Sequence, residues 1–239
     1  MGPVLFCLAV DELQPVCDNT SVIKYADDVT FLHFVRNACE DDLQSEWDNL
    51  EDWSRAIHLP LNFLKCKVMN IITKKSLSLP LIHSSDGNSI NDVNSVSFLG
   101  VTFCNDMKWN IHFDKIVKKA CKRLFIMYNL RRSGCSHEIL FKCYSAFIRP
   151  LFLYDFPCFC NAPDYLLRKF LLIERRIFRI IGSNNFRSLL EVAEDSSSKL
   201  VCSIEQCLTH PLREWFDLLR TLPSHIKHLP TSAYQNRTF

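Results

Sequence analysis

The chain has 239 residues and a net charge of +2, and 48% of its residues are hydrophobic, 23% charged and 12% aromatic. This length allows one or two domains with a buried core, and the 18 Phe residues exclude a disordered or fibrous protein. The 12 Cys residues are too dilute for a small disulfide scaffold, so we expect mostly buried thiols in a reducing compartment.

The first element that the sequence predicts is a β-hairpin over residues 22–34, VIKYADDVTFLHF. Two short runs rich in β-branched and aromatic residues meet at Ala26, Asp27 and Asp28. This pattern places the two carboxylates at or near the tip of the hairpin.

A helix and further short strands follow the hairpin. Apolar residues at helical spacing predict a helix over about 38–57, with Asp and Glu on the opposite face. Strands are predicted over 67–73 and 96–103. Within 79–90, the dipeptide Asp86-Gly87 predicts a hairpin turn.

The second half of the chain has the periodicity of helices. An apolar stripe predicts a helix from about 110 to 132, and a second helix begins near a Ser136 cap. The second helix must bend or stop at Pro150. A third helix is predicted over 165–181, ending at Gly182.

These elements predict an α+β protein with a boundary near residue 105. We expect a mixed unit over 1–105, a helical unit over 106–182 and a C-terminal extension over 183–239. The helical signal weakens beyond 186, and the serines at 196–198 predict a break.

Charge is distributed unevenly along the chain. Residues 37–52 contain acidic side chains and no basic one, whereas 114–132 contain seven basic residues against one acidic. A second basic cluster includes Arg168, Lys169, Arg175, Arg176 and Arg179. This asymmetry favours a polyanionic partner, although a basic stripe is more often an ordinary solvated face.

No segment has the pattern of a membrane span or an export signal. The most apolar stretch, residues 139–160, contains three charged residues and two prolines. The N-terminal run MGPVLFCLAV has no basic residues before its apolar part. We therefore expect no membrane partner and an intracellular protein, in the nucleus or the cytoplasm, that is not secreted.

Adjacent Asp residues in a tight hairpin repel one another and need a cation. Hard oxygen ligands suit Mg²⁺ or Mn²⁺, and two such ions can support nucleotidyl transfer. Asp pairs are also common without any such role, and Asp41-Asp42 is assigned to a solvated helix face.

The segment Tyr25-Ala26-Asp27-Asp28 resembles the Tyr/Phe-x-Asp-Asp box of reverse transcriptases, specifically those of non-LTR (LINE-like or jockey-like) retrotransposons. Other segments resemble further motifs of this family in the same order over about residues 2–182. They are 1–6 with 11–13, Trp53 with 61–67, 98–100, 118–124, 148–150 with Tyr154, and 174–182.

The resemblance implies part of a reverse-transcriptase palm, its hairpin and helix, followed by a helical thumb. It implies that Asp27 and Asp28 are catalytic residues that bind Mg²⁺ or Mn²⁺, and that Lys65 lies near the phosphates of the incoming nucleotide. The implied contacts to the primer are Tyr25, Phe98, Leu99 and Gly100, and those to the nucleic-acid backbone are Lys115, Lys118, Lys119, Lys122 and Arg123. The implied partners are an RNA template, a DNA primer and deoxynucleoside triphosphates.

One departure from the family pattern affects the expected activity. The family's other essential carboxylate precedes the first motif matched here, so we expect an RNA-directed DNA polymerase that is truncated and inactive alone. The alternative is a non-enzymatic, nucleic-acid-binding remnant of a retroelement. A third class is a helical interaction module whose basic faces have no role in nucleic-acid binding.

Two further interpretations compete with these roles. Lysines such as Lys65 and Lys67 at a strand edge often only keep that edge soluble. Cysteines and histidines could form a zinc site, although none has the paired C-x2-C spacing typical of one. The residues in question are Cys158, Cys160, Cys202, Cys207, His210, His225 and His228.

Overall fold

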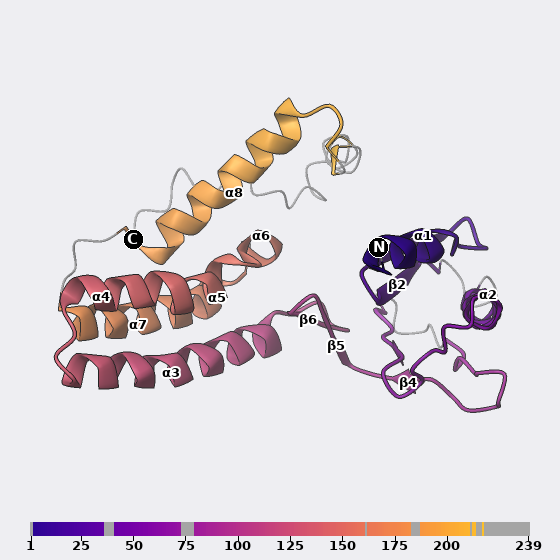
Figure 1. The fold of residues 1–239 in the computed structure, drawn as a ribbon, viewed down its shortest axis with the longest axis horizontal. Coiled ribbons are helices and arrows are strands. Elements are labelled where there is room, and N and C mark those ends of the chain that lie inside the picture. The colour runs from indigo at the N-terminus through magenta and orange to yellow at the C-terminus, as the bar shows by residue number, and fades with distance from the viewer. Residues whose placement is uncertain are drawn as a thin grey trace. The chain divides into compact units, whose positions relative to one another are not determined.

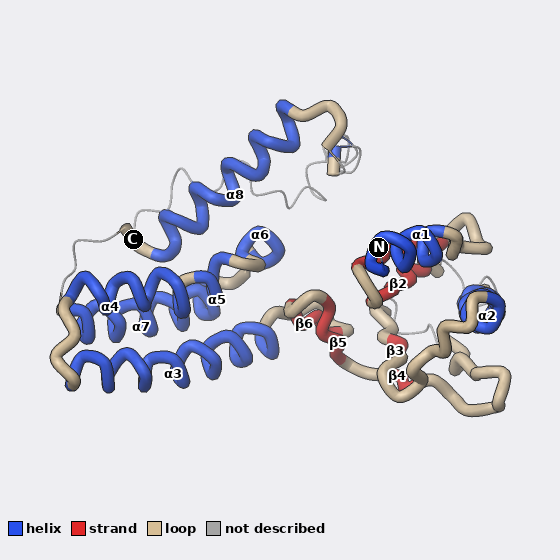
Figure 2. Tube along the Cα trace, in the orientation of Figure 1, coloured by secondary structure: helices blue, strands red, loops and turns tan. Residues whose placement is uncertain are grey.

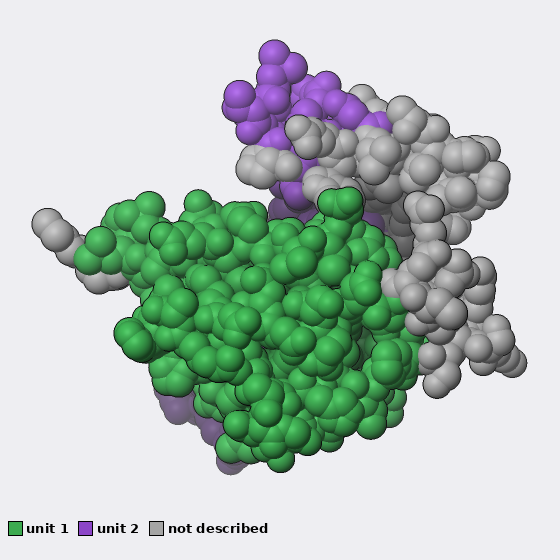
Figure 3. Space-filling view, turned by 90° about the vertical axis from the view of Figure 1, so that its right-hand side faces the viewer, with its two compact units in different colours: residues 1–108 green, residues 109–239 purple. Residues whose placement is uncertain are grey.

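The computed structural model describes residues 2–35, 41–72, 79–160, 162–182, 187–210, 212, 213 and 217. The chain is a mixed α and β protein that divides into two compact units, residues 1–108 and 109–239 (Figure 3). All of the described strands belong to the first unit (Figure 2). No helix among the described residues is both long and apolar enough to cross a membrane.

The first unit combines two helices with short strands (Figure 1). Its elements are α1 (Gly2–Asp11), β1 (Thr20–Tyr25), β2 (Asp28–His33), α2 (Leu43–Ala56), β3 (Lys67–Val68), β4 (Asn91–Asp92), β5 (Ser95–Phe98) and β6 (Val101–Cys104). The described strands form three separate two-stranded sheets. The pairs β1–β2 and β5–β6 are antiparallel, and β3–β4 is parallel.

Two predictions for this unit need correction, and a third is confirmed. Within the range 67–73 that was predicted as a strand, the structure describes a strand of two residues, β3. Residue 73, the last of the predicted range, lies outside the described residues. The strand predicted over 96–103 is a hairpin, because Leu99 and Gly100 turn the chain with φ of 47° and 85°. The Asp86-Gly87 turn is confirmed, since Gly87 has φ of 79° and an antiparallel bridge joins His83 to Ser89.

Helix α2 organises the unit through buried carboxylates. Glu46 and Glu51 are only 1% and 4% exposed, so the prediction that the acidic residues of this helix lie in solvent is wrong for these two. Glu46 accepts hydrogen bonds from the backbone N–H groups of Val16 and Cys17. Glu51 accepts from the N–H of Ser85. These bonds tie α2 to loops about 30 residues away in the sequence.

The second unit is built from helices (Figure 1). They are α3 (Asn110–Arg132), α4 (His137–Cys143), the π-helical segment η2 (Tyr144–Ile148), α5 (Pro150–Leu153), α6 (Phe156–Phe159), α7 (Asp164–Ile181) and α8 (Leu189–Gln206). Helix α4 begins at the predicted Ser136 cap, which accepts from the N–H of Ile139. Helix α7 ends at the predicted Gly182, in the left-handed conformation.

Stacked aromatic rings fill the core of this unit. Phe113 of α3 stacks on Phe170 of α7 with ring centroids 4.5 Å apart, and Phe152 and Phe159 approach the same ring edge-on. All four side chains are at most 1% exposed. Each fully buried ring stabilises the unit by roughly 1.5–3 kcal/mol, so this cluster holds α3 and α7 together.

The predicted break at Pro150 takes the form of a wider helical turn. Proline has no N–H, and its ring clashes with the carbonyl four residues earlier in a regular helix. Residues Tyr144–Ile148 are π-helical, and the N–H of Arg149 bonds to the carbonyl of Tyr144, five residues back. This widening lets the chain continue from α4 into α5 without stopping.

The break predicted at residues 196–198 is wrong, because α8 runs through these serines. A capping box of Ser188 and Glu191 starts the helix, and Leu189 and Ala193 are buried. The Ser196 hydroxyl donates to the carbonyl of Val192 instead of interrupting the helix. Capping and burial therefore outweigh the weak helix propensity of serine.

Candidate functional site

The tip of the β1–β2 hairpin presents the two predicted carboxylates. Tyr25 pairs with Asp28, so Ala26 and Asp27 form a two-residue turn. Such turns require a positive φ at the first central position in type I′ and II′ geometry, and Ala26 has φ of 51°. The prediction that the hairpin presents Asp27 and Asp28 at its tip is therefore confirmed.

Both carboxylates are exposed to solvent. Within the described residues, the side chains of Asp27 and Asp28 form no ion pair and accept no hydrogen bond. Two hard, solvated carboxylates suit Mg²⁺ or Mn²⁺, which protein sites hold through one or two carboxylates together with substrate phosphates. The pair fits that role in chemistry but would supply only part of a ligand set. No cluster of three or more His, Cys, Asp or Glu side chains that could hold a metal occurs in the described part of the chain.

Tyr25 and Asp28 lie on the same face of the hairpin. Residues directly opposite in an antiparallel pair project to one side of the sheet, and the register pairs Tyr25 with Asp28 and Ile23 with Thr30. The Tyr25 ring is 61% exposed, and Ile23 is 41% exposed. A carboxylate is thus flanked by an exposed aromatic ring and an exposed aliphatic side chain.

Lys65 lies in a turn beside helix α2. Its backbone N–H donates to the carbonyl of Asn62, and its neighbour Phe63 contacts the Trp47 ring with centroids 6.0 Å apart. Lys65 is exposed. In the part of the chain that the structure describes, no hydrogen bond or ion pair joins it to Asp27 or Asp28.

The predicted primer-contacting segment is the β5–β6 turn. Phe98 pairs with Val101, which leaves Leu99 and Gly100 as the two turn residues. Both have positive φ, as a type I′ turn requires. Phe98 and Leu99 are half-buried and Gly100 is exposed.

The predicted basic residues of α3 do not all share one environment. Lys118, Lys119 and Lys122 are exposed and have no ion-pair partner among the described residues. Lys115 is exposed as well. Arg123 is half-buried and donates to the carbonyl of Phe147 in η2, so the structure places it apart from the exposed lysines.

Helix α7 adds basic residues that the resemblance did not assign to a site. Arg168, Arg175 and Arg179 are exposed and form no ion pair within the described ranges. Their spacing of seven and four residues places them on one face of the helix. This spacing was the sequence signal that could have identified them.

Buried carboxylates in both units have structural roles. Burial favours a raised pKa of Glu46, but hydrogen bonds from the Cys17 and Val16 N–H groups outweigh it and lower that pKa. In the second unit, burial raises the pKa of Glu174 despite hydrogen bonds from the Leu189 N–H at 2.6 Å and the Tyr144 hydroxyl at 3.3 Å. Glu174 therefore anchors the start of α8.

The prediction that most cysteines are buried is wrong, because only Cys104 and Cys160 are buried in the described part of the chain.

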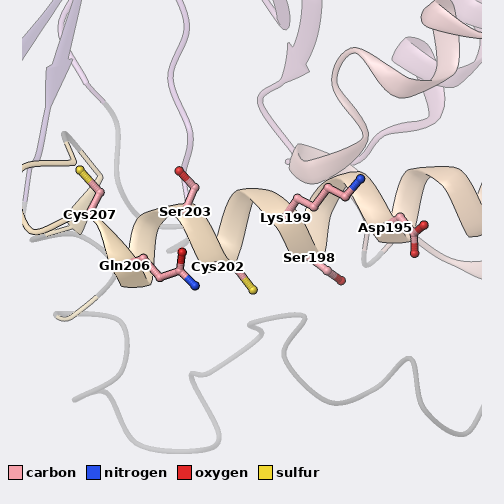
Figure 4. Close-up of a pocket in the computed structure, with 7 residues that line it drawn as sticks. All are labelled: Asp195, Ser198, Lys199, Cys202, Ser203, Gln206 and Cys207. Atoms are coloured by element: carbon pink, nitrogen blue, oxygen red, sulfur yellow. The ribbon is translucent and has the colours of Figure 1, made fainter.

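A shallow hollow of about 760 Å³ lies along α8, and its lining includes Lys199, Cys202 and Cys207 (Figure 4). Figure 4 shows the two thiols pointing to different sides of the helix. The predicted zinc candidates His225 and His228 lie outside the described residues.

Comparison with protein-family models, with curated proteins and with solved structures finds no match for this chain.

Proposed function

We propose that this chain carries the catalytic hairpin and the helical thumb of an RNA-directed DNA polymerase, the reverse transcriptase of a non-LTR retrotransposon. The observation that carries the proposal is the hairpin tip, where Asp27 and Asp28 are exposed without a cationic partner among the described residues. Adjacent carboxylates repel one another, so the placement of Asp27 in the turn and Asp28 at the start of β2 favours a bound cation.

In this proposal Asp27 and Asp28 hold a divalent metal ion. Mg²⁺ or Mn²⁺ supplies charge neutralisation at the attacking and leaving oxygens of nucleotidyl transfer. Tyr25, on the same face as Asp28, packs beside the primer terminus. Lys65 attracts the phosphates of the incoming deoxynucleoside triphosphate.

The remaining assigned residues position the nucleic acid. The turn at Phe98, Leu99 and Gly100 brings backbone close to the primer, since glycine has no side chain to prevent that approach. Exposed lysines of α3 contact phosphates of the template–primer duplex. Such contacts fix position and do not read sequence.

The second candidate function is nucleic-acid binding without synthesis. It is favoured by the incomplete ligand set, because Asp27 and Asp28 have no third acidic or histidine side chain clustered with them in the described residues. A metal site that lacks ligands loses the geometry needed for catalysis.

Primer extension separates the two functions. The full chain is incubated with an RNA template, a labelled DNA primer, deoxynucleoside triphosphates and Mn²⁺ or Mg²⁺. Metal-dependent extension that is lost in Asp27→Asn and kept in Asp86→Asn, an exposed control in another turn, supports the polymerase. Binding without extension supports the second function, and absence of both contradicts each of them.

A further inference from the structure

Helices α3 and α7 pack side by side and run in the same direction. Near their first turns, Tyr165 donates to Asn110 at 2.6 Å and Lys169 pairs with Asp114 at 2.7 Å. At the other end, His137, which follows α3, bonds to the carbonyl of Ile181 in α7. The solvent-facing sides of the two helices therefore lie next to each other along their length.

Each helix carries a row of cations on its exposed side. The lysine row of α3 is Lys118, Lys119 and Lys122, and the arginine row of α7 is Arg168, Arg175 and Arg179. Both rows lie opposite the buried stripes that contain Phe113 and Phe170.

These rows have few acidic neighbours on their own helices. Asp114 and Asp164 lie in the first turns, four residues before Lys118 and Arg168, and Asp114 pairs with Lys169. No Asp or Glu occurs between residues 115 and 137, and the one acid between 165 and 190, Glu174, is buried. Like charges four residues apart, such as Arg175 and Arg179, destabilise a helix. Beyond the first turns, the exposed charges of the two helices within the described residues are therefore mainly positive, which suits a polyanion.

Exposed apolar side chains lie among the cations. Leu172 lies between Arg168 and Arg175 on the same helical face and is 56% exposed. Phe125 of α3 follows Lys118 by seven residues and is 68% exposed. Basic residues clustered along one face of a helix are typical of a surface that binds nucleic acid.

We infer that the arginine row of α7 binds the phosphate backbone of a nucleic-acid duplex, beside the lysine row of α3. The inference extends the proposed function, on which it rests for the identity of the polyanion. From Arg168 to Arg179 the helix rises about 16 Å, which, measured along the axis of a duplex, spans about five phosphates of one strand at 3.4 Å each. Parallel packed helices are roughly 8–10 Å apart, so two rows can follow the backbones on the two sides of a groove.

The test measures how binding of the full chain to a labelled RNA–DNA duplex depends on salt. The arginine variant replaces Arg168, Arg175 and Arg179 by Gln, which keeps helix propensity and removes three charges. Because each lost phosphate contact changes the slope of log K against log salt by about 0.9, we expect a slope shallower by roughly 2 to 3. A control with the same charge change replaces Lys108, Lys142 and Lys199 by Gln, and its slope is expected to match that of the wild type.

Other outcomes separate this inference from the proposed function. A lysine variant replaces Lys118, Lys119 and Lys122 by Gln. If this variant has a shallower slope but the arginine variant has the slope of the wild type, the α7 row does not contact the duplex. The inference then fails while the proposed function stands. If the control flattens the slope equally, only net charge matters and the inference fails. A wild type without salt-dependent binding contradicts both proposals. Undiminished binding to a duplex with neutral methylphosphonate linkages overturns the phosphate assignment.

Discussion

Ala26 occupies a backbone conformation that costs free energy for every residue except glycine. Its φ of 51° is needed because the turn between Tyr25 and Asp28 contains only two residues. The left-handed region costs an L-residue roughly 1–2 kcal/mol, and strain of this kind is often kept at functional sites. Here the strain sets the position of Asp27 and Asp28.

Replacing Ala26 by Gly relieves this strain. We expect Ala26→Gly to raise the free energy of unfolding by about 0.5–1 kcal/mol, since glycine also loses more chain entropy on folding. Urea unfolding of the full chain measures the change. The control Ala56→Gly, in the right-handed helix α2, is expected to have the opposite sign. A loss of stability in Ala26→Gly would contradict the turn geometry.

Glu174 and Glu46 are expected to make the free energy of unfolding depend on pH in opposite directions. Burial raises the pKa of Glu174 above 4.5, so between the unfolded and folded pKa values the folded protein binds more protons. Its contribution to stability is therefore present below about pH 4.5 and is lost as the pH rises through the raised pKa. The lowered pKa of Glu46 makes its own contribution present above about pH 4.5 and lost in acid.

Glu174→Gln keeps an oxygen that can accept from the Leu189 N–H and removes the buried charge. As the pH is raised from 4.5 to 7.5, we expect the free energy of unfolding to fall less in the variant than in the wild type. Urea unfolding at both pH values measures this difference, with Glu138→Gln, an exposed carboxylate, as the control. Equal losses in the wild type and Glu174→Gln would show that Glu174 does not titrate in this range.

At the scale of elements, sequence periodicity was sufficient to predict the helices that bury an apolar stripe. It identified α3 and α7 because their aromatic and aliphatic residues recur on one face, and glycine marked the end of α7 at Gly182. It missed the division of residues 96–103, because Leu99 is not a residue type that indicates positive φ. It also missed the burial of Glu46, whose hydrogen-bond donors lie 29 and 30 residues earlier in the chain.

Helix α8 depends on its first turn, since its serine-rich middle has weak helix propensity. Ser188→Ala removes the oxygen that accepts from the Glu191 N–H, and we expect the helix to lose about 1 kcal/mol. Amide hydrogen exchange should be faster along α8 and unchanged in α3. Ser198→Ala, an exposed serine in the middle of the same helix, is the control and should not speed exchange. Unchanged exchange in Ser188→Ala would contradict the role of the cap.

At the scale of the whole molecule, both units expose apolar side chains, such as Phe125 at 68% and Leu172 at 56% in the second unit. The second unit has a continuous aromatic core. In the first unit, α1 exposes Val4, Leu5 and Leu8 by 61–65%, and the hairpin exposes Ile23 and Tyr25. Exposed apolar surface of this kind marks an interaction site or a tendency to aggregate. The sequence predicted the hairpin that carries Asp27 and Asp28 and the basic helix α3, whereas the side-by-side rows of α3 and α7 required the packing of the fold.

Binding of a template–primer duplex is the property that the proposed polymerase and the proposed binding surface share. The most direct test is the salt dependence of binding between the wild-type chain and an RNA–DNA duplex. The lysine row of α3 predicts a log–log slope of about −3, and the arginine row of α7 makes it steeper. A slope near zero, or no binding at low salt, would contradict a nucleic-acid function for this protein.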